Sequence, residues 1–127
     1  AYTWYNSDAK TNGGAAGTEN GGSCPDEGNC DIEKYVSSVN AIGLCGHDDW
    51  RMPQREELGS IIDYSTVSPA IAANYFPNTR SSWYWTASPY ALNNSYALGV
   101  NFSGGSGHYD FYKDRNLSVR LVRPDIN

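Results

Sequence analysis

The C-terminal third of the chain constrains the fold most, because it breaks into short runs of β-forming residues separated by turn-forming ones. In one of these runs Leu98, Val100 and Phe102 alternate with small or polar residues, which is the period of a strand with one buried face. The pattern predicts an antiparallel meander, and it excludes a coiled coil, a collagen helix and a helical bundle. The runs are 83–90, 96–103, 108–113 and 118–123.

The N-terminal part predicts a strand, a long loop and a helix. Residues 2–5 alternate and are rich in β-formers, whereas 11–29 form a Gly, Asn, Ser and Thr loop with almost nothing to bury. Asp31 has the side chain of a helix N-cap, and Gly43 supplies a helix stop. The apolar residues at helical spacing between them are Ile32, Tyr35, Val36 and Val39.

A second helix is predicted from Pro53, since proline is favoured at the first helical position. Its apolar stripe comprises Leu58, Ile61 and Ile62, and it ends before Ser65. A strand, two helices and then a meander form an α+β pattern, with two helices packed on a small antiparallel sheet and long loops. At 127 residues and 13.9 kDa, the chain is expected to form a single domain over residues 1–127.

The charge is unevenly distributed along the chain. The net charge is −5, but residues 1–63 carry −7 and residues 64–127 carry +2. An acidic protein of this kind is not expected to bind nucleic acid, which requires a basic surface. No run approaches the length of a membrane span, so no membrane insertion is expected. The basic second half can still present a local positive patch.

The three cysteines are Cys24, Cys30 and Cys45. A helix between Cys30 and Cys45 would hold them roughly 15 Å apart, beyond the roughly 7 Å that a disulfide spans. We favour a Cys24–Cys30 disulfide across a turn-rich loop, with Cys24–Cys45 as the alternative. Three reduced thiols in a cytosolic protein are the other reading. A zinc site is disfavoured, because His47 is the only imidazole nearby.

Five segments together resemble one bacterial surface-domain family, that of the C-terminal domain of the Legionella collagen-like adhesin. They are 43–58, Tyr75–Thr79, Trp83–Tyr90, Val100–Phe102 and Ser118–Arg123. The resemblance implies a C-type-lectin-like variant fold and an extracellular or cell-surface head at the C-terminal end of a longer protein. It also implies a homotrimer that binds sulfated glycosaminoglycans and supports attachment and biofilm growth. Gln54 departs from the pattern, since a Thr cap is common there.

Catalysis is not expected, and neither is a cofactor. Cys45 and His47 are two apart on an irregular loop, a poor geometry for a nucleophile and its base. The neighbouring acids Glu56 and Glu57 diverge by about 100° on a helix, so they cannot flank one glycosidic bond. We interpret them as a solvated face near a helix N-terminus. The late paired cysteines of the related formylglycine-generating enzymes are absent.

Calcium-dependent sugar binding is also disfavoured, because neither Glu-Pro-Asn, Gln-Pro-Asp nor Trp-Asn-Asp occurs in the sequence. A structural calcium near Asp48, Asp49 or Asp63 stays open, since oxygen ligands are plentiful there.

The predicted glycan site consists of cations in the second half of the chain. Sulfates are well matched by Arg and Lys side chains on exposed loops. Lys113 and Arg115 lie on a polar turn and are the first candidates, followed by Arg123 and Arg80. Asp110 and Asp114 reduce the local positive charge. A single domain offers few charges, so useful affinity would require a multivalent trimer.

The alternative function is recognition of a protein by a variable face, as in some relatives of the implied fold. Residues 90–116 are rich in Tyr, Asn, Ser and Gly, the composition of adaptable binding surfaces. The predicted contact residues are Tyr90, Asn93, Asn94, Tyr96, His108, Tyr109 and Tyr112.

The segment 49–53 is interpreted as structural. Trp50 is expected in the core, Arg51 in a pair with a carboxylate or carbonyls, and Pro53 at the start of the helix. Trp83 and Trp85 lie on one face of a strand, with Trp85 expected in the core.

Overall fold

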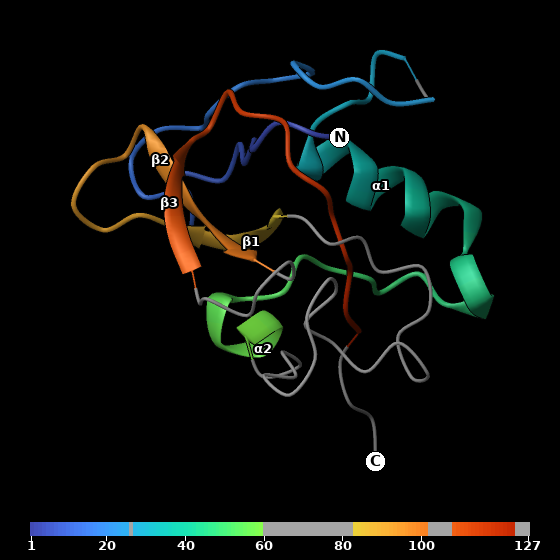
Figure 1. Ribbon diagram of the computed structural model, residues 1–127. Coiled ribbons are helices and arrows are strands. Elements are labelled where there is room, and N and C mark those ends of the chain that lie inside the picture. Colours follow the sequence, from blue (N-terminus) through green and yellow to red (C-terminus); the bar gives the residue numbers. More distant parts are fainter. Residues whose placement is uncertain (26, 60–82, 102–107, 124–127) are drawn as a thin grey trace.

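A computed structural model describes residues 1–25, 27–59, 83–101 and 108–123, and it confirms the α+β class (Figure 1). The helices are α1 (Ile32–Ile42), the short 3-10 turn η1 (Leu44–Gly46) and α2 (Arg55–Gly59). The strands are β1 (Trp83–Pro89), β2 (Tyr96–Asn101) and β3 (His108–Tyr112). The three strands form one antiparallel sheet in the order β1-β2-β3, so β2 is central, as a meander predicts.

The predicted caps of α1 are confirmed. The Asp31 carboxylate accepts a hydrogen bond from the Lys34 amide at 2.8 Å, and Gly43 ends the helix at φ 63°. Asp31 is fully buried, and it also accepts from the Asn20 amide and the Lys34 ammonium. This carboxylate therefore joins the long loop to the start of α1.

The start of α2 is held by neighbours in place of a Thr cap. Glu57 accepts a hydrogen bond from the Gln54 amide at 2.8 Å, which is half of a capping box. The Ser88 hydroxyl of β1 accepts from the Arg55 amide. Glu57 also forms an ion pair with Arg51, so the predicted carboxylate partner of Arg51 is confirmed. Glu57 is 39% exposed near the N-terminus of α2, as predicted, and it also holds Arg51 and the Gln54 amide.

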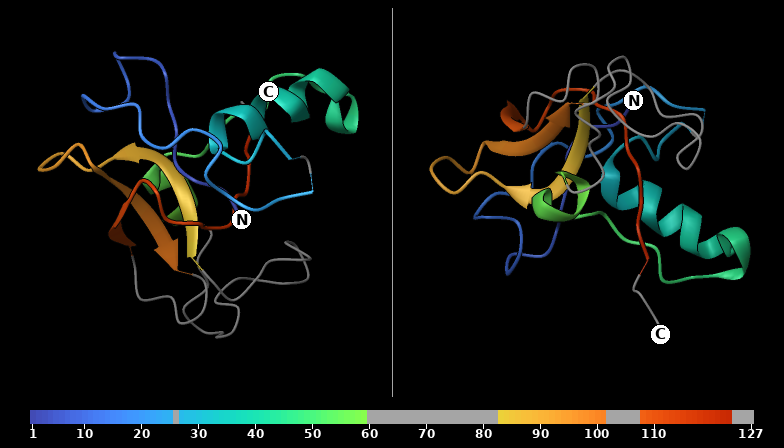
Figure 2. Two further views of the ribbon diagram at one scale, coloured as in Figure 1. Left: turned by 90° about the horizontal axis from the view of Figure 1, so that it is seen from above. Right: turned by 60° about the horizontal axis from the view of Figure 1, so that its bottom comes forward.

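The described part of α2 is shorter than the predicted helix. Leu58 is buried, as its place in the predicted apolar stripe requires. Ile61, Ile62 and Ser65 lie outside the described residues. In Figures 1 and 2, α2 lies against one side of the sheet, while the N-terminal segment passes over the other side.

The core lies between the sheet, the N-terminal segment and α1. The two indole N–H groups in it donate to backbone carbonyls, Trp4 to Thr86 and Trp85 to Tyr2. These bonds satisfy polar atoms that burial would otherwise leave unpaired. Trp85 is fully buried, as predicted, and Trp83 packs against the same cluster. The buried members are Trp4, Ile32, Trp85, Ala97 and Leu117.

Residues 2–5 and 118–123 do not form the predicted strands. Tyr2 bridges Leu117, Thr3 bridges Asp31 and Tyr5 bridges Gly17, so successive residues contact three different segments. The late run likewise makes only single bridges, from Ser118 and Val122. Each β-forming run is bridged to other segments, but the bridged segment changes from one bridge to the next, so no continuous ladder forms.

The Cys24–Cys30 disulfide is confirmed, and Cys45 is a free, exposed thiol. Trp50 corrects another expectation, because it is only half-buried and lies outside the core cluster. Its indole N–H donates to the Leu44 carbonyl, and the guanidinium of Arg123 lies 5.8 Å from its ring. Trp50 therefore supports the turn after α1.

Candidate ligand-binding groove

A groove of about 880 Å³ follows the edge of β3 that faces away from β2. The Lys113 amide donates to the Ser95 carbonyl, which makes Tyr96 and Tyr112 a pair without mutual backbone hydrogen bonds. The backbone groups of Asp110 therefore point away from β2, toward the groove. We call this hollow the edge groove; the side chains that define it are Trp83, Tyr96, Asp110, Phe111, Tyr112 and Arg115.

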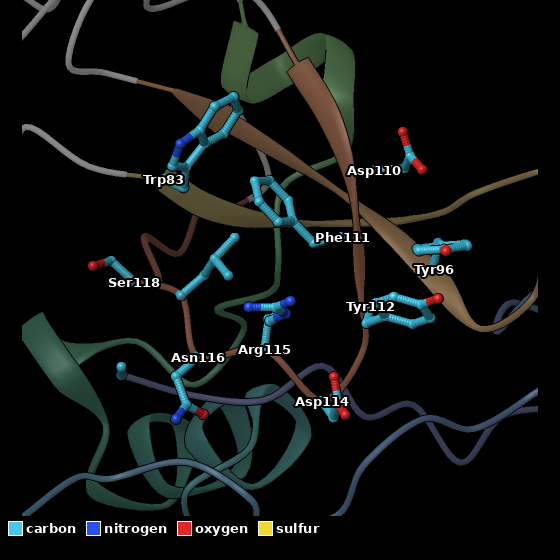
Figure 3. Close-up of a pocket in the computed structure, with 11 residues that line it drawn as sticks. Trp83, Tyr96, Asp110, Phe111, Tyr112, Asp114, Arg115, Asn116 and Ser118 are labelled. Carbon is cyan, nitrogen blue, oxygen red and sulfur yellow. The ribbon is translucent and has the colours of Figure 1, made fainter.

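The edge groove has two chemically different walls. Figure 3 shows them separated by the β3 ribbon, as strand alternation requires. The first wall consists of Trp83, Phe111 and Arg115, and the second of Tyr96, Asp110 and Tyr112.

The first wall combines aromatic rings with a cation. Trp83 and Phe111 meet edge to face, with ring centroids 4.9 Å apart. The Arg115 amide donates to the Tyr112 carbonyl, closing a turn that brings this side chain back along the groove (Figure 3). Arg115 is exposed, and within the described ranges its guanidinium makes no ion pair or hydrogen bond. It is therefore open to an anionic group.

The Tyr96 and Tyr112 rings of the second wall adjoin Tyr90 of the neighbouring hollow, and we call these three residues the tyrosine face. The rings of Tyr96 and Tyr112 lie 4.3 Å apart, and Tyr90 meets Tyr96 edge to face at 6.2 Å. The Tyr112 hydroxyl, together with burial and the nearby Asp110 charge, raises the pKa of Tyr96. The predicted contact residues Tyr90, Tyr96 and Tyr112 are thus brought together.

Asp110 connects the edge groove to a second hollow of about 400 Å³ beside α2. Tyr90, Leu98 and Arg55 line that second hollow. Asp110 is exposed, and no hydrogen bond or ion pair reaches its carboxylate from the described part of the chain. The surface therefore continues from Arg115 across the tyrosine face to α2.

Lys113 is not an exposed cation, and its prediction as a glycan contact is wrong. Its side chain is 3% exposed, and its ammonium donates to the carbonyls of Asn12 at 3.1 Å and Ala15 at 2.7 Å. The same ammonium lies 4.4 Å from the centre of the Trp4 ring. Burial lowers the pKa of this lysine. Lys113 is a structural residue that holds the early loop.

Arg123 is also engaged within the protein. Its Nε donates to the Asp49 carboxylate at 2.9 Å, and this bond lowers the pKa of Asp49. Arg123 does not line the edge groove, and its role as a glycan contact stays a prediction. Arg80 lies outside the described residues. Of the four predicted cations, the described structure brings only Arg115 to the groove.

The other predicted contact residues are placed differently. Asn93 and Asn94 are exposed in the turn between β1 and β2, where the Asn93 side chain accepts from the Ser95 amide. Asn94 borders a smaller hollow next to Tyr112. The side chains of His108 and Tyr109 lie outside the described residues, although their backbone pairs with β2.

The sequence itself indicates that the Lys113 side chain points into the core. Residues 109, 111 and 113 share one side of the predicted strand, and the Phe111 ring belongs to the core side. Strand period alone therefore placed Lys113 inward. Strand period does not predict the direction of the Arg115 side chain, because the turn after Tyr112 interrupts the alternation. The groove residues Trp83, Phe111 and Asn116 carried no separate ligand signal.

The residues considered for catalysis and metal binding are scattered. Cys45 and His47 are exposed, and Glu57 is bound to Arg51. No group of three or more His, Cys, Asp or Glu side chains in the described ranges is arranged to hold a metal ion. Asp49 pairs with Arg123, and Asp63 is not described. Likewise, no described helix is long and apolar enough to cross a membrane.

Comparison with known families gives a match over most of the chain. The family described as the Lcl C-terminal domain matches residues 2–123. The chain belongs to this family. Lcl membership assigns it to the domains of collagen-like surface proteins, and it confirms the resemblance seen in the sequence. No curated protein and no solved structure matched, so the C-type-lectin-like assignment stays a prediction.

Proposed function

We propose that this Lcl domain is a non-catalytic adhesion head that binds an anionic glycan in the edge groove, at or outside the bacterial surface. The proposed ligand class is a sulfated glycosaminoglycan or a similar acidic polysaccharide. The observation that carries the proposal is the Arg115 guanidinium, exposed and without an ion pair in the described structure, beside the Trp83 and Phe111 rings.

The first wall supplies the contacts that such a ligand needs. A guanidinium can donate two parallel hydrogen bonds to a sulfate or a carboxylate. Ring faces offer apolar contact to the C–H groups of a sugar. Asn116 and Ser118 also border the groove and add polar side chains along its length. A groove of this kind suits an extended polymer with occasional acidic groups.

The charge balance limits how strong one site can be. Lys113 is internal, and Asp110 and Asp114 border the same groove as Arg115. We therefore propose weak binding by a single domain and useful avidity from a homotrimer, which presents three copies at once. This arrangement supports attachment and biofilm growth without a cofactor.

Heparin chromatography tests the proposal. The wild-type domain should be retained at low salt and elute as sodium chloride rises, because salt screens the charges. Arg115→Gln should elute at a sodium chloride concentration several-fold lower than that of the wild type. Lys10→Gln removes the same charge from an exposed position in the early loop and should elute like the wild type. Light scattering on the same fractions gives the oligomeric state.

Equal retention of the wild type and Arg115→Gln would contradict the proposed site. The second candidate function is recognition of a protein ligand. It is favoured by the tyrosine face and by Leu92, which follows Tyr90 closely in the sequence and is 83% exposed. It predicts binding that hardly depends on salt, survives Arg115→Gln and is lost in Tyr112→Ala.

A further inference from the structure

The two walls of the edge groove differ in charge sign as well as in aromatic composition, and a second carboxylate, Asp114, borders the end of the groove near the turn. Arg115 lies with Trp83 and Phe111 on one side of β3 (Figure 3). On the other side Asp110 lies next to Tyr96 and Tyr112. A ligand that spans both walls therefore meets a cation first and then an anion backed by aromatic rings.

The Asp110 side of the groove has the parts of a subsite for a positively charged nitrogen. The Tyr96 and Tyr112 rings stack at 4.3 Å, and Tyr112 is 49% exposed. An ammonium group is attracted both to ring faces and to a carboxylate. The Asp110 carboxylate has no partner among the described residues, so no internal bond has to break for it to bind.

The same carboxylate disfavours a uniformly sulfated chain. A second sulfate placed at the tyrosine face would meet Asp110, and like charges at short range oppose binding. A sugar with a free amino group would satisfy Asp110 and could still place its ring against Tyr112. Asp110 therefore acts on specificity more than on total affinity.

We propose that the edge groove selects glycans that carry an acidic group and a free amino group close together, with the acid at Arg115 and the ammonium at Asp110. The inference rests on the proposed function, because it names the ligand class of the same groove. It makes an amino sugar next to an acidic sugar the preferred unit.

A matched pair of polymers isolates the amino group. N-desulfated heparin carries acidic groups and free amines, and its N-acetylated derivative differs only in having those amines blocked. The domain should bind the free-amine form about fivefold to tenfold more tightly, as the sum of an exposed ion pair and a cation–π contact suggests. Isothermal titration calorimetry on the intact domain measures both dissociation constants.

Three variants assign the difference to residues. Asp110→Asn should reduce the preference for the free-amine polymer to about twofold to threefold, because the ion pair is lost and only the contact with the Tyr96 and Tyr112 rings remains. Asp48→Asn is the control, since Asp48 is also exposed and borders neither hollow. It should keep the full preference. Arg115→Gln should weaken binding of both polymers.

The outcomes separate the two proposals. Equal binding of both polymers by the wild type, or tighter binding of the acetylated one, overturns the amino-group inference and leaves the glycan groove standing. A preference that is undiminished in Asp110→Asn also overturns the inference. No binding of either polymer overturns the proposed glycan function and the inference together. A circular dichroism spectrum of each variant excludes loss of folding as the cause.

Discussion

The turn that ends β3 separates two regions, each centred on one cation. On its inner side Lys113 is buried against Trp4 and bound to two carbonyls of the early loop. On its outer side Arg115 is exposed in the edge groove. The two residues are two positions apart in the sequence and have opposite roles. Proximity in sequence therefore says little about whether neighbouring charges form one patch.

The two regions also differ in what they demand of a positive charge. A buried ammonium loses its hydration and must be compensated by hydrogen bonds and ring contacts, which Asn12, Ala15 and Trp4 provide. An exposed guanidinium needs no such compensation and keeps its donors available. The first region is thus a structural element, and the second is available to a ligand.

The largest expected effect tests the inner region. Lys113→Met should lower the free energy of unfolding by about 3 kcal/mol, because two buried carbonyls lose a charged donor. Urea denaturation at neutral pH measures the loss. Lys10→Met, at an exposed position, should stay within about 0.5 kcal/mol of the wild type. Equal stability of the two variants would show that Lys113 is not a structural residue.

A glycine pair tests how tightly the inner region is packed. Gly17 has φ +96°, and a Cβ there would collide with the Trp4 carbonyl oxygen and lie 3.2 Å from the Lys113 chain. Gly28 has a similar φ of +90°, but nothing lies within 4 Å of its Cβ position. Gly17→Ala should therefore destabilise the domain by about 2 kcal/mol more than Gly28→Ala, measured by the same denaturation. A matching loss in both would mean that backbone strain alone is responsible.

The outer region should tolerate change. Arg115→Gln is expected to alter the free energy of unfolding by less than about 0.5 kcal/mol, since its side chain has no partner among the described residues. Differential scanning calorimetry of Arg115→Gln and Lys113→Met compares the stability of the two variants directly. A large loss of stability in Arg115→Gln would remove the distinction between the two regions.

A pH-dependent effect, smaller than those of Lys113→Met and Gly17→Ala, concerns an ion pair at intermediate exposure. The Arg51 guanidinium, helped by the Gln54 amide, lowers the pKa of Glu57 from 4.5 to about 2. The folded pKa is depressed, so this stabilisation is complete above pH 4.5 and is lost as the pH falls toward 2. Because Glu57 is 39% exposed, Glu57→Gln should lose less than about 1 kcal/mol at pH 7.

The same variant should approach the wild type near pH 2. Urea midpoints at pH 7 and pH 2.5 measure this convergence. Unfolding curves that differ equally at both pH values would exclude the Arg51 pair as the source of the stabilisation.

Local signals predicted those parts of the fold that depend on neighbours in sequence. Asp31 and Gly43 marked the ends of α1, and Cys24 and Cys30 were close enough to pair. The alternating runs predicted the meander. The single bridges of residues 2–5 could not be predicted, because their partners are distant and change at every step.

The candidate site was predicted only in part. Composition identified Tyr90, Tyr96 and Tyr112, since tyrosines in a turn-rich segment indicate a binding surface. Counting cations identified Arg115 but also Lys113, because a count ignores which way a strand residue points. The partners of Lys113 are backbone carbonyl oxygens, and they could not be predicted from the sequence because every residue carries one.

The bridges of the N-terminal segment have a consequence for how the domain folds. Tyr2 hydrogen-bonds to Leu117, and the Trp4 amide donates to the Lys113 carbonyl. Residues near the start of the domain therefore pair with residues near its end. During synthesis, this first segment lacks its partners until almost the entire domain has emerged. Because these contacts join distant parts of the chain, folding should be slow, and the domain should fold as one cooperative unit.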